Sequence, residues 1–355
     1  MATATEPEPE RVVVAYHYPC PDGAFGALAA HVALRARGAR VRWAPLKVFL
    51  PEAERIASLA AALAPDETLF LIDITGGAAF VAACCARARR VVVLDHHKTG
   101  EADLAAPALA GLANLERHFD MARSGATIAR DYFGLPALLL GAGAGADADA
   151  ARQRPDQVLR LFSLVEDNDL FRHALPDSKL FSAGLEDMRL EFDANAGGGG
   201  GPDAVFSRLL ALDADETIAR GRVAVVEQDR VIGEELAAAF RVDIAGPAGG
   251  APLMSCLAVV TRHPDLRSTQ GNRLAAQSAA AGLAAAGAVV YEEAALGADT
   301  LKVSLRSVGD VDTTVVSSAF GGGGHKNASS FNAARSAVES WRGAGAAAAA
   351  AGVKA

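Results

Sequence analysis

Length, composition and charge limit the classes of protein to which this chain can belong. With 355 residues it is long enough for two domains that each bury a core. A formal net charge of −8 argues against binding duplex DNA or long RNA, because such binding relies on basic surface. Much of the 51% apolar content is alanine, and no apolar run has the length of a transmembrane helix.

The first residues and the cysteines indicate a compartment. Residues 1–11 are acidic and contain proline, which fits neither a secretory signal nor a transit peptide. Four cysteines in so long a chain do not resemble a disulfide framework, so a reducing compartment is favoured. We therefore expect a cytoplasmic protein that binds no membrane, although an organelle signal can be cryptic.

Short apolar runs alternate with helical spacing over the first hundred residues. The pattern predicts strands at 12–15, 41–48, 68–72 and 91–94, with helices after residue 23 and at 51–63 and 77–88. Alternation of this kind implies right-handed βαβ units. We expect an α/β fold whose amino-terminal domain is built on a parallel sheet.

The rest of the chain predicts a second, smaller α/β domain. Ser124 is expected to cap a helix that ends at Phe133, and a helix at 157–165 leads into the polar stretch 166–171. Further expected elements are loops at 141–151 and 197–201, a long helix at 204–240, and then strand, helix, strand, strand and helix at 253–261, 272–285, 288–292, 301–307 and 313–320. The expected domains are a catalytic domain at 11–200, a helical linker at 203–248, a substrate-binding domain at 250–340 and a disordered alanine-rich tail at 341–355.

Acidic and imidazole side chains gather where the predicted strands end. Ligands of open α/β sheets bind at that edge. The candidate set comprises His17, Asp22, Asp73, His96 and Asp167. Any one of them could instead cap a helix, form a turn or lie satisfied in the core. Together they supply the hard donors that two divalent ions need, with one carboxylate able to bridge both. The predicted reaction is therefore metal-dependent hydrolysis of a phosphoester.

A glycine run near the carboxyl end is the second candidate feature. Glycines expose backbone N–H groups to phosphate, but a run of them is weak evidence alone, and 197–201 reads as a plain linker. Gly321–Gly324 differs because it leads directly into His325 and Lys326, with Arg306 in the preceding strand. We expect Arg306 and Lys326 to hold substrate phosphates through charge-assisted contacts.

These motifs, in this order, resemble those of the DHH phosphoesterase superfamily with its DHH-associated carboxy-terminal domain. The resemblance spans about residues 12–331 and rests on His17-x-x-x-x-Asp22-Gly23, Asp73, Asp95-His96-His97, Glu166-Asp167 and the glycines before His325. The Cys-Pro-Asp-Gly sequence at 20–23 is similar to one branch of that superfamily, close to nanoRNases and cyclic-nucleotide phosphodiesterases.

The resemblance implies a role for each matching residue. Two Mn²⁺ or Mg²⁺ ions are implied in the amino-terminal domain, with Asp73 bridging them. His17 is implied as a ligand of one ion, and Asp22, His96 and Asp167 as ligands of the other. The residues implied or expected to contact substrate are His97, Arg306, Gly322, Gly323, Gly324, His325 and Lys326. Asp95, expected together with His97 to be catalytic, reads best as an acid that orients an imidazole or a metal-bound water.

Two positions leave alternatives open. Many family members carry a carboxylate where this chain has Cys20, which is either a soft and therefore weak ligand or only a turn residue between two prolines. Asp169 competes with Asp167 as the fourth-segment ligand; the resemblance favours Asp167, and spacing does not decide between them.

The sequence thus predicts a two-metal phosphoesterase acting on a small nucleotide phosphodiester or a very short oligonucleotide. The alternative enzyme is a nucleotide 3′-phosphomonoesterase. The alternative that is not an enzyme is a nucleotide- or RNA-binding protein whose catalytic activity has been weakened or lost through Cys20. The exact substrate, the polarity on oligonucleotides and the choice between monomer and homodimer are left open by the sequence.

Overall fold

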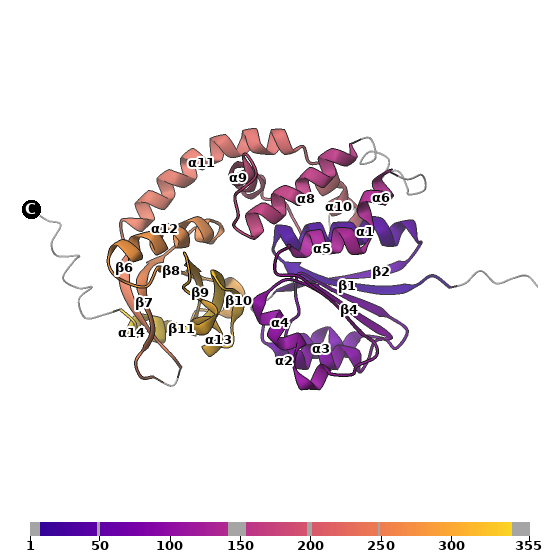
Figure 1. The fold of residues 1–355 in the computed structure, drawn as a ribbon, viewed down its shortest axis with the longest axis horizontal. Coiled ribbons are helices and arrows are strands. Elements are labelled where there is room, and N and C mark those ends of the chain that lie inside the picture. Colours follow the sequence, from indigo (N-terminus) through magenta and orange to yellow (C-terminus); the bar gives the residue numbers. More distant parts are fainter. Residues whose placement is uncertain (1–7, 48–49, 141–153, 197–200, 248, 343–355) are drawn as a thin grey trace, which may run out of the picture. The chain divides into compact units, whose positions relative to one another are not determined.

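The computed structural model describes residues 8–47, 50–140, 154–196, 201–247 and 249–342. The chain divides into two compact units, residues 1–224 and 225–355 (Figure 1). The expected loop at 141–151, most of the glycine linker at 197–201 and the tail from residue 343 lie outside the described residues.

Unit 1 is built on a five-stranded sheet in which every neighbouring pair is parallel. The strand order is β2-β1-β3-β4-β5. The strands are β1 (Arg11–Tyr18), β2 (Arg40–Lys47), β3 (Thr68–Ile72), β4 (Arg90–Asp95) and β5 (Leu115–Phe119). The predicted parallel sheet is therefore confirmed, with β5 as a strand that the sequence pattern did not predict.

Helices cover both faces of this sheet. They are α1 (Pro21–Ala36), α2 (Glu52–Ser58), α3 (Ala78–Cys85), α4 (Lys98–Leu104), α5 (Gly125–Tyr132), α6 (Leu135–Leu140), α8 (Pro155–Asp169), α9 (Ser178–Met188), α10 (Gly201–Leu210) and α11 (Ala214–Leu236), which runs on into unit 2. Short 3₁₀ turns lie at Ala60–Ala62 and Pro107–Leu109. Ser124 caps α5 as predicted, since its hydroxyl oxygen accepts the Thr127 N–H.

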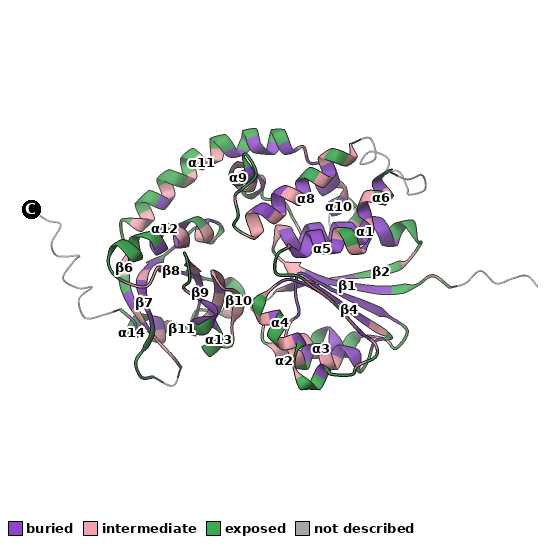
Figure 2. Cartoon of the chain, in the orientation of Figure 1, coloured by how far each residue is buried: buried purple, intermediate pink, exposed green. Residues whose placement is uncertain are grey.

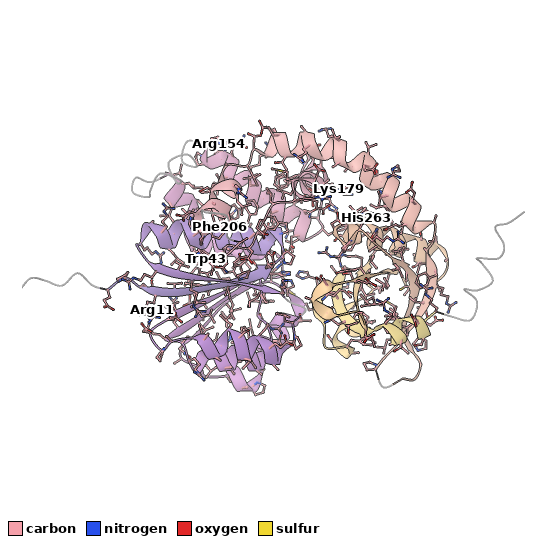
Figure 3. All side chains as sticks on the ribbon, turned by 180° about the vertical axis from the view of Figure 1, so that it is seen from behind. Arg11, Trp43, Arg154, Lys179, Phe206 and His263 are labelled. Atoms are coloured by element: carbon pink, nitrogen blue, oxygen red, sulfur yellow. The ribbon has the colours of Figure 1, made fainter. Side chains whose placement is uncertain are left out.

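Alternate residues of each central strand enter opposite cores. Val12 and Val14 of β1 face one core with α1, α5 and α8, whereas Val13 faces the other core with α3. Figure 2 shows the central strands as buried. At the edge of the first core, the rings of Trp43 and Phe206 lie 4.7 Å apart between centroids (Figure 3).

Unit 2 contains a six-stranded sheet of order β10-β11-β9-β8-β7-β6, in which only the β7–β8 pair is parallel. The strands are β6 (Phe240–Ala245), β7 (Pro252–Val260), β8 (Ala286–Glu292), β9 (Thr300–Ser307), β10 (Gly323–His325) and β11 (Ala328–Ala334). The helices are α12 (Arg267–Ala280), α13 (Thr314–Ala319) and α14 (Arg335–Ser340), with 3₁₀ turns at Pro264–Leu266 and Ala294–Leu296. This smaller α/β unit agrees with the predicted fold class.

Two expected elements are different in the structure. The long helix expected at 204–240 is two helices, α10 and α11, and its last residue, Phe240, opens strand β6. The helix expected at 157–165 continues to Asp169, so residues 166–169 form its last turn rather than a loop. Among the described residues, none of the helices combines the length and apolar character of a membrane span.

Candidate metal centre

The carboxyl ends of three neighbouring parallel strands bring the candidate ligands of unit 1 together. His17 lies near the end of β1, Asp73 follows β3, and Asp95 ends β4 immediately before His96. Because β1, β3 and β4 are adjacent and parallel, these ends lie at one edge of the sheet. The parallel register, which the sequence only implied, explains why residues distant in the chain are neighbours.

Asp73 lies at the centre of the cluster. Its Oδ2 is 3.0 Å from His17 Nδ1, and its Oδ1 is 3.1 Å from His96 Nε2. The side chain is 1% exposed, and the backbone has a φ of 60°, a left-handed conformation that disfavours any residue with a side chain. The two carboxylate oxygens thus face different imidazoles.

The amino end of α5 fixes Asp22. The backbone N–H groups of Gly125 and Ala126 donate to the two Asp22 carboxylate oxygens, at 2.7 and 3.0 Å. Free N–H groups at the start of a helix favour a negative charge. Asp22 Oδ2 lies 3.5 Å from His96 Nε2, which places this carboxylate beside the imidazole that Asp73 contacts.

The structure brings Asp169, and not Asp167, to this cluster. Asp169 Oδ2 lies 3.5 Å from His96 Nε2 and is buried with no hydrogen-bond partner among the described residues. Asp167 instead accepts the N–H groups of Ala174 and Leu175, at 2.9 and 3.2 Å. The resemblance favoured Asp167, whereas in the structure Asp169 is the carboxylate that lies beside His96. Residues 166–169 are helical, so Asp167 and Asp169 point to different sides of α8.

Asp95 holds His97 and the start of the following segment. Its Oδ1 accepts the His96 N–H at 2.8 Å and lies 2.8 Å from His97 Nδ1, while Oδ2 accepts the Thr75 hydroxyl at 2.6 Å. Burial alone would raise the pKa of Asp95, but the charge and hydrogen bond of His97 outweigh it and lower the pKa to about 2. Asp95 is therefore an ionised acceptor that fixes the ring of His97.

The charges of the cluster are strongly unbalanced. Burial and the charges of Asp73 and Asp169 raise the pKa of Asp22 well above its ordinary value. Burial would raise the pKa of Asp73 as well, but hydrogen bonds from His17 and His96 lower it well below the usual range. Burial would lower the pKa of His96, and its hydrogen bond to Asp73 and the nearby carboxylates instead raise it to about 11. Several buried carboxylates therefore compete for few positive charges.

A divalent cation fits this donor set. Within unit 1, two groups of three described residues each offer ligand atoms within 4.8 Å of one another, namely His17, Asp73 and His97, and Asp22, Asp73 and His96. Asp73 belongs to both groups. Oxygen and imidazole donors suit Mn²⁺ and Mg²⁺, and a cation would offset the cost of burying like charges and of leaving the Asp169 oxygen without a partner.

Cys20 lies near the cluster but outside both groups of donors, as far as the described residues go. It precedes α1 in an extended conformation. Burial and the charges of Asp73, Asp169 and Asp22 raise the pKa of its thiol well above the ordinary value. These surroundings disfavour the thiolate form.

Sequence reasoning gave no packing role to three glycines that let the cluster close, although Gly23 belongs to a quoted motif. A Cβ on Gly125 would lie 2.6 Å from the Asp73 Cβ, one on Gly23 would lie 2.2 Å from the His17 carbonyl oxygen, and one on Gly100 would lie 2.6 Å from Asp95 Oδ2. Gly23 is the third residue of α1 and follows Asp22, and Gly125 is the first residue of α5 and follows Ser124. A glycine directly after a polar residue at the start of a helix is the sequence signal that could have identified these two positions.

The expected substrate residues of unit 2 form a local group of their own. β10 pairs with β11, and a Cβ on Gly322, just before β10, would lie 2.1 Å from the Ser330 carbonyl oxygen. Gly324 of β10 has a φ of 136°. Arg306 of β9 donates to the Ser268 hydroxyl at 2.9 Å and lies opposite Ala328 of β11. Lys326 Nζ lies 2.9 Å from Asp310, an exposed pair.

Comparisons with known proteins give matches to solved structures. The chain is similar to RecJ from Thermus thermophilus in complex with Mn²⁺ (TM-score 0.47, 18% identity), with 96% of this chain and 52% of that one covered. It is similar to an exopolyphosphatase-related protein from Bacteroides fragilis (TM-score 0.47, 13% identity, 91% and 86% covered). It is also similar to the pGpG-specific phosphodiesterase PggH from Vibrio cholerae (TM-score 0.42, 12% identity, 93% and 95% covered). No protein-family model and no curated protein matches the chain.

Proposed function

We propose that this chain is a metal-dependent phosphoesterase of the DHH superfamily, whose motifs it carries in order along the sequence. The observation that carries this proposal is the position of Asp73 between two donor groups, with one carboxylate oxygen facing His17 and the other facing His96. A carboxylate shared in this way is what a pair of divalent ions requires.

The proposed ligands are His17, Asp22, Asp73, His96 and Asp169, with Mn²⁺ or Mg²⁺ as the two ions. Asp169 takes the place that the resemblance gave to Asp167. Ions bound here would polarise a phosphoryl group and lower the pKa of a water molecule so that it attacks phosphorus.

Asp95 and His97 have separate proposed roles. Asp95 accepts at His97 Nδ1, so a neutral His97 carries its proton there and presents Nε2 as an acceptor, whereas a protonated His97 donates from Nε2. In the protonated form, His97 can donate to a phosphate oxygen. Asp95 is thus a positioning residue, and His97 a substrate contact.

The residues of unit 2 are proposed to bind substrate phosphates. Gly322–Gly324 keep the backbone before His325 free of side chains. Arg306 carries positive charge on β9, which pairs with the other side of β11, and Lys326 carries it in the turn between β10 and β11. We propose small nucleotide phosphodiesters or very short oligonucleotides as substrates, because the net charge of −8 disfavours long polyanions.

A metal-supplemented substrate screen on two variants tests this function. Short oligoribonucleotides, cyclic nucleotides and 3′-phosphorylated adenosine nucleotides are incubated with wild-type protein and Mn²⁺. Asp73→Asn should abolish turnover of every substrate that the wild type cleaves, because it removes the shared carboxylate.

Asp66→Asn is the matched control. Asp66 precedes the same strand at its other end, where its exposed side chain forms an ion pair with Arg11 at 3.0 Å. It should retain full turnover. Undiminished turnover in Asp73→Asn, or wild-type hydrolysis that EDTA leaves intact, would contradict the proposal.

A further inference from the structure

A short segment directly after the metal centre displays two aromatic rings. Phe171 and His173 follow the end of α8, and their ring centroids lie 4.1 Å apart with planes at 67°. Phe171 is 47% exposed. Asp169, the proposed metal ligand, precedes Phe171 by two residues, so their Cα atoms are at most about 7 Å apart.

The backbone of this segment is held in an unfavourable conformation. Phe171 has a φ of 52° and His173 a φ of 49°. Such left-handed positions after a helix are usually taken by glycine, and a bulky side chain there costs roughly 1 kcal/mol or more. An exposed phenylalanine gains little from burial that would offset this cost. Helix termination by itself would therefore favour glycine at position 171.

Asp167 fixes the segment in this form. Its backbone carbonyl accepts the N–H groups of Arg172 and His173, at 2.9 and 3.3 Å, and its carboxylate accepts those of Ala174 and Leu175. Four hydrogen bonds to one residue thus shape the turn that carries the rings. Asp167 therefore shapes the aromatic segment, whereas Asp169 lies beside His96 in the cluster.

We propose that Phe171, supported by His173, is a stacking platform for a nucleobase of the substrate. The inference rests on the proposed function, because it takes the scissile phosphate to lie at the cluster that Asp169 joins. Aromatic faces bind bases of any sequence by stacking, which suits an enzyme for short nucleotides of mixed sequence. The substrate class is then a nucleoside phosphate ester, and an ester without a base is bound more weakly.

The experiment compares a ligand that carries a base with one that does not. Full-length protein with Mn²⁺ is titrated with 2-aminopurine riboside 5′-monophosphate, followed by its fluorescence, and with ribose 5-phosphate, followed by calorimetry. The variants are Phe171→Ala, Phe171→Gly and Phe171→Trp, with Leu140→Ala as the control. Leu140 ends α6 and is 77% exposed.

Phe171→Ala and Phe171→Gly should weaken binding of the base-carrying ligand by about five- to hundredfold, while the affinity for ribose 5-phosphate stays unchanged. Phe171→Trp and Leu140→Ala should bind like the wild type. Phe171→Gly should also unfold at an equal or higher urea concentration than the wild type, because glycine relieves the backbone strain.

Equal affinity of wild type and Phe171→Ala for 2-aminopurine riboside 5′-monophosphate would overturn the platform. So would an equal loss for both ligands, because it would show a structural role. If the wild type binds neither ligand in the presence of Mn²⁺, the proposed function fails, and that outcome is distinct from the failure of the platform alone.

Discussion

Exchanging the carboxylates of Asp167 and Asp169 for amides, one at a time, should give opposite results. Each change replaces one oxygen by an NH₂ group and leaves the size of the side chain almost the same. The two residues differ only in what surrounds their carboxylates, so the pair is its own control. We expect Asp167→Asn to destabilise the fold and Asp169→Asn to weaken metal binding.

The magnitudes follow from the contacts. In Asp167→Asn, the NH₂ group faces a backbone N–H that the carboxylate accepted, of Ala174 at 2.9 Å or of Leu175 at 3.2 Å. Losing a hydrogen bond to a charged acceptor costs about 1.5–3 kcal/mol of the free energy of unfolding. Asp169 Oδ2 has no hydrogen-bond partner among the described residues and lies among other buried carboxylates, so Asp169→Asn should cost less metal-free stability than Asp167→Asn.

For metal affinity the larger loss should occur in Asp169→Asn rather than in Asp167→Asn. Loss of groups that only orient a ligand already lowers metal affinity about 10- to 100-fold, so Asp169→Asn should lower Mn²⁺ affinity at least about tenfold. Asp167→Asn should bind Mn²⁺ almost like the wild type. Urea unfolding in EDTA measures the stabilities, and calorimetric titration with Mn²⁺ measures the affinities. If Asp167→Asn lost Mn²⁺ and Asp169→Asn retained it, the assignment of Asp169 would be wrong.

Two further predictions concern packing and pH. Gly125→Ala should lower Mn²⁺ affinity, because the new Cβ would lie 2.6 Å from the Cβ of Asp73. The control Gly233→Ala, in α11 with no neighbour within 4 Å, should raise the free energy of unfolding by about 0.5–1 kcal/mol. Urea unfolding and Mn²⁺ titration of both variants check this, and unaltered Mn²⁺ binding in Gly125→Ala would contradict it. Burial, followed by the charge of Arg267, lowers the pKa of Lys302 from 10.5 to about 8, so the unfolded state binds more protons between these values and stability rises with pH across this window. Burying the charged form of Lys302 costs about 3 kcal/mol, and Lys302→Met removes this cost. The gain in the free energy of unfolding should therefore be largest below pH 8 and should fade towards pH 10.5. A pH-independent difference from the wild type would contradict the lowered pKa of Lys302.

Much of unit 1 was predictable because its sheet has a simple pattern. Buried parallel strands are continuous apolar runs, such as residues 91–94, and polar residues follow them where the chain leaves the sheet. β5 was missed because Leu115–Phe119 holds Glu116, Arg117 and His118, and an edge strand with such residues has no apolar run. β11 was missed for a similar reason, since Ala328–Ala334 consists largely of small residues that only pairing with β9 makes a strand.

Packing partners from distant segments were not predictable from single motifs. Asp22 is held by Gly125 and Ala126, about a hundred residues away, and Glu166 accepts the Ser124 N–H at 3.1 Å. Glu166 thus ties the last turn of α8 to the helix that fixes Asp22. Nothing in the spacing of the motifs shows such a contact, because it depends on how α5 and α8 pack on α1.

The sequence could have distinguished Asp169 from Asp167 if residues 166–169 had been taken as helical. Successive residues of a helix turn by about 100°, so these two side chains point about 160° apart. Val158, Phe162 and Val165 are buried in the core. Asp169 follows them by eleven, seven and four residues respectively, which is the spacing of one helix face. When residues 166–171 are taken as a loop, the helical spacing no longer applies to Asp167 and Asp169. The choice then rested on the resemblance, which favoured Asp167. On the opposite side of the helix, Asp167 accepts the hydrogen bonds that shape the turn after Phe171. The position of one helix end therefore decides both which carboxylate lies beside His96 and which one holds the aromatic segment.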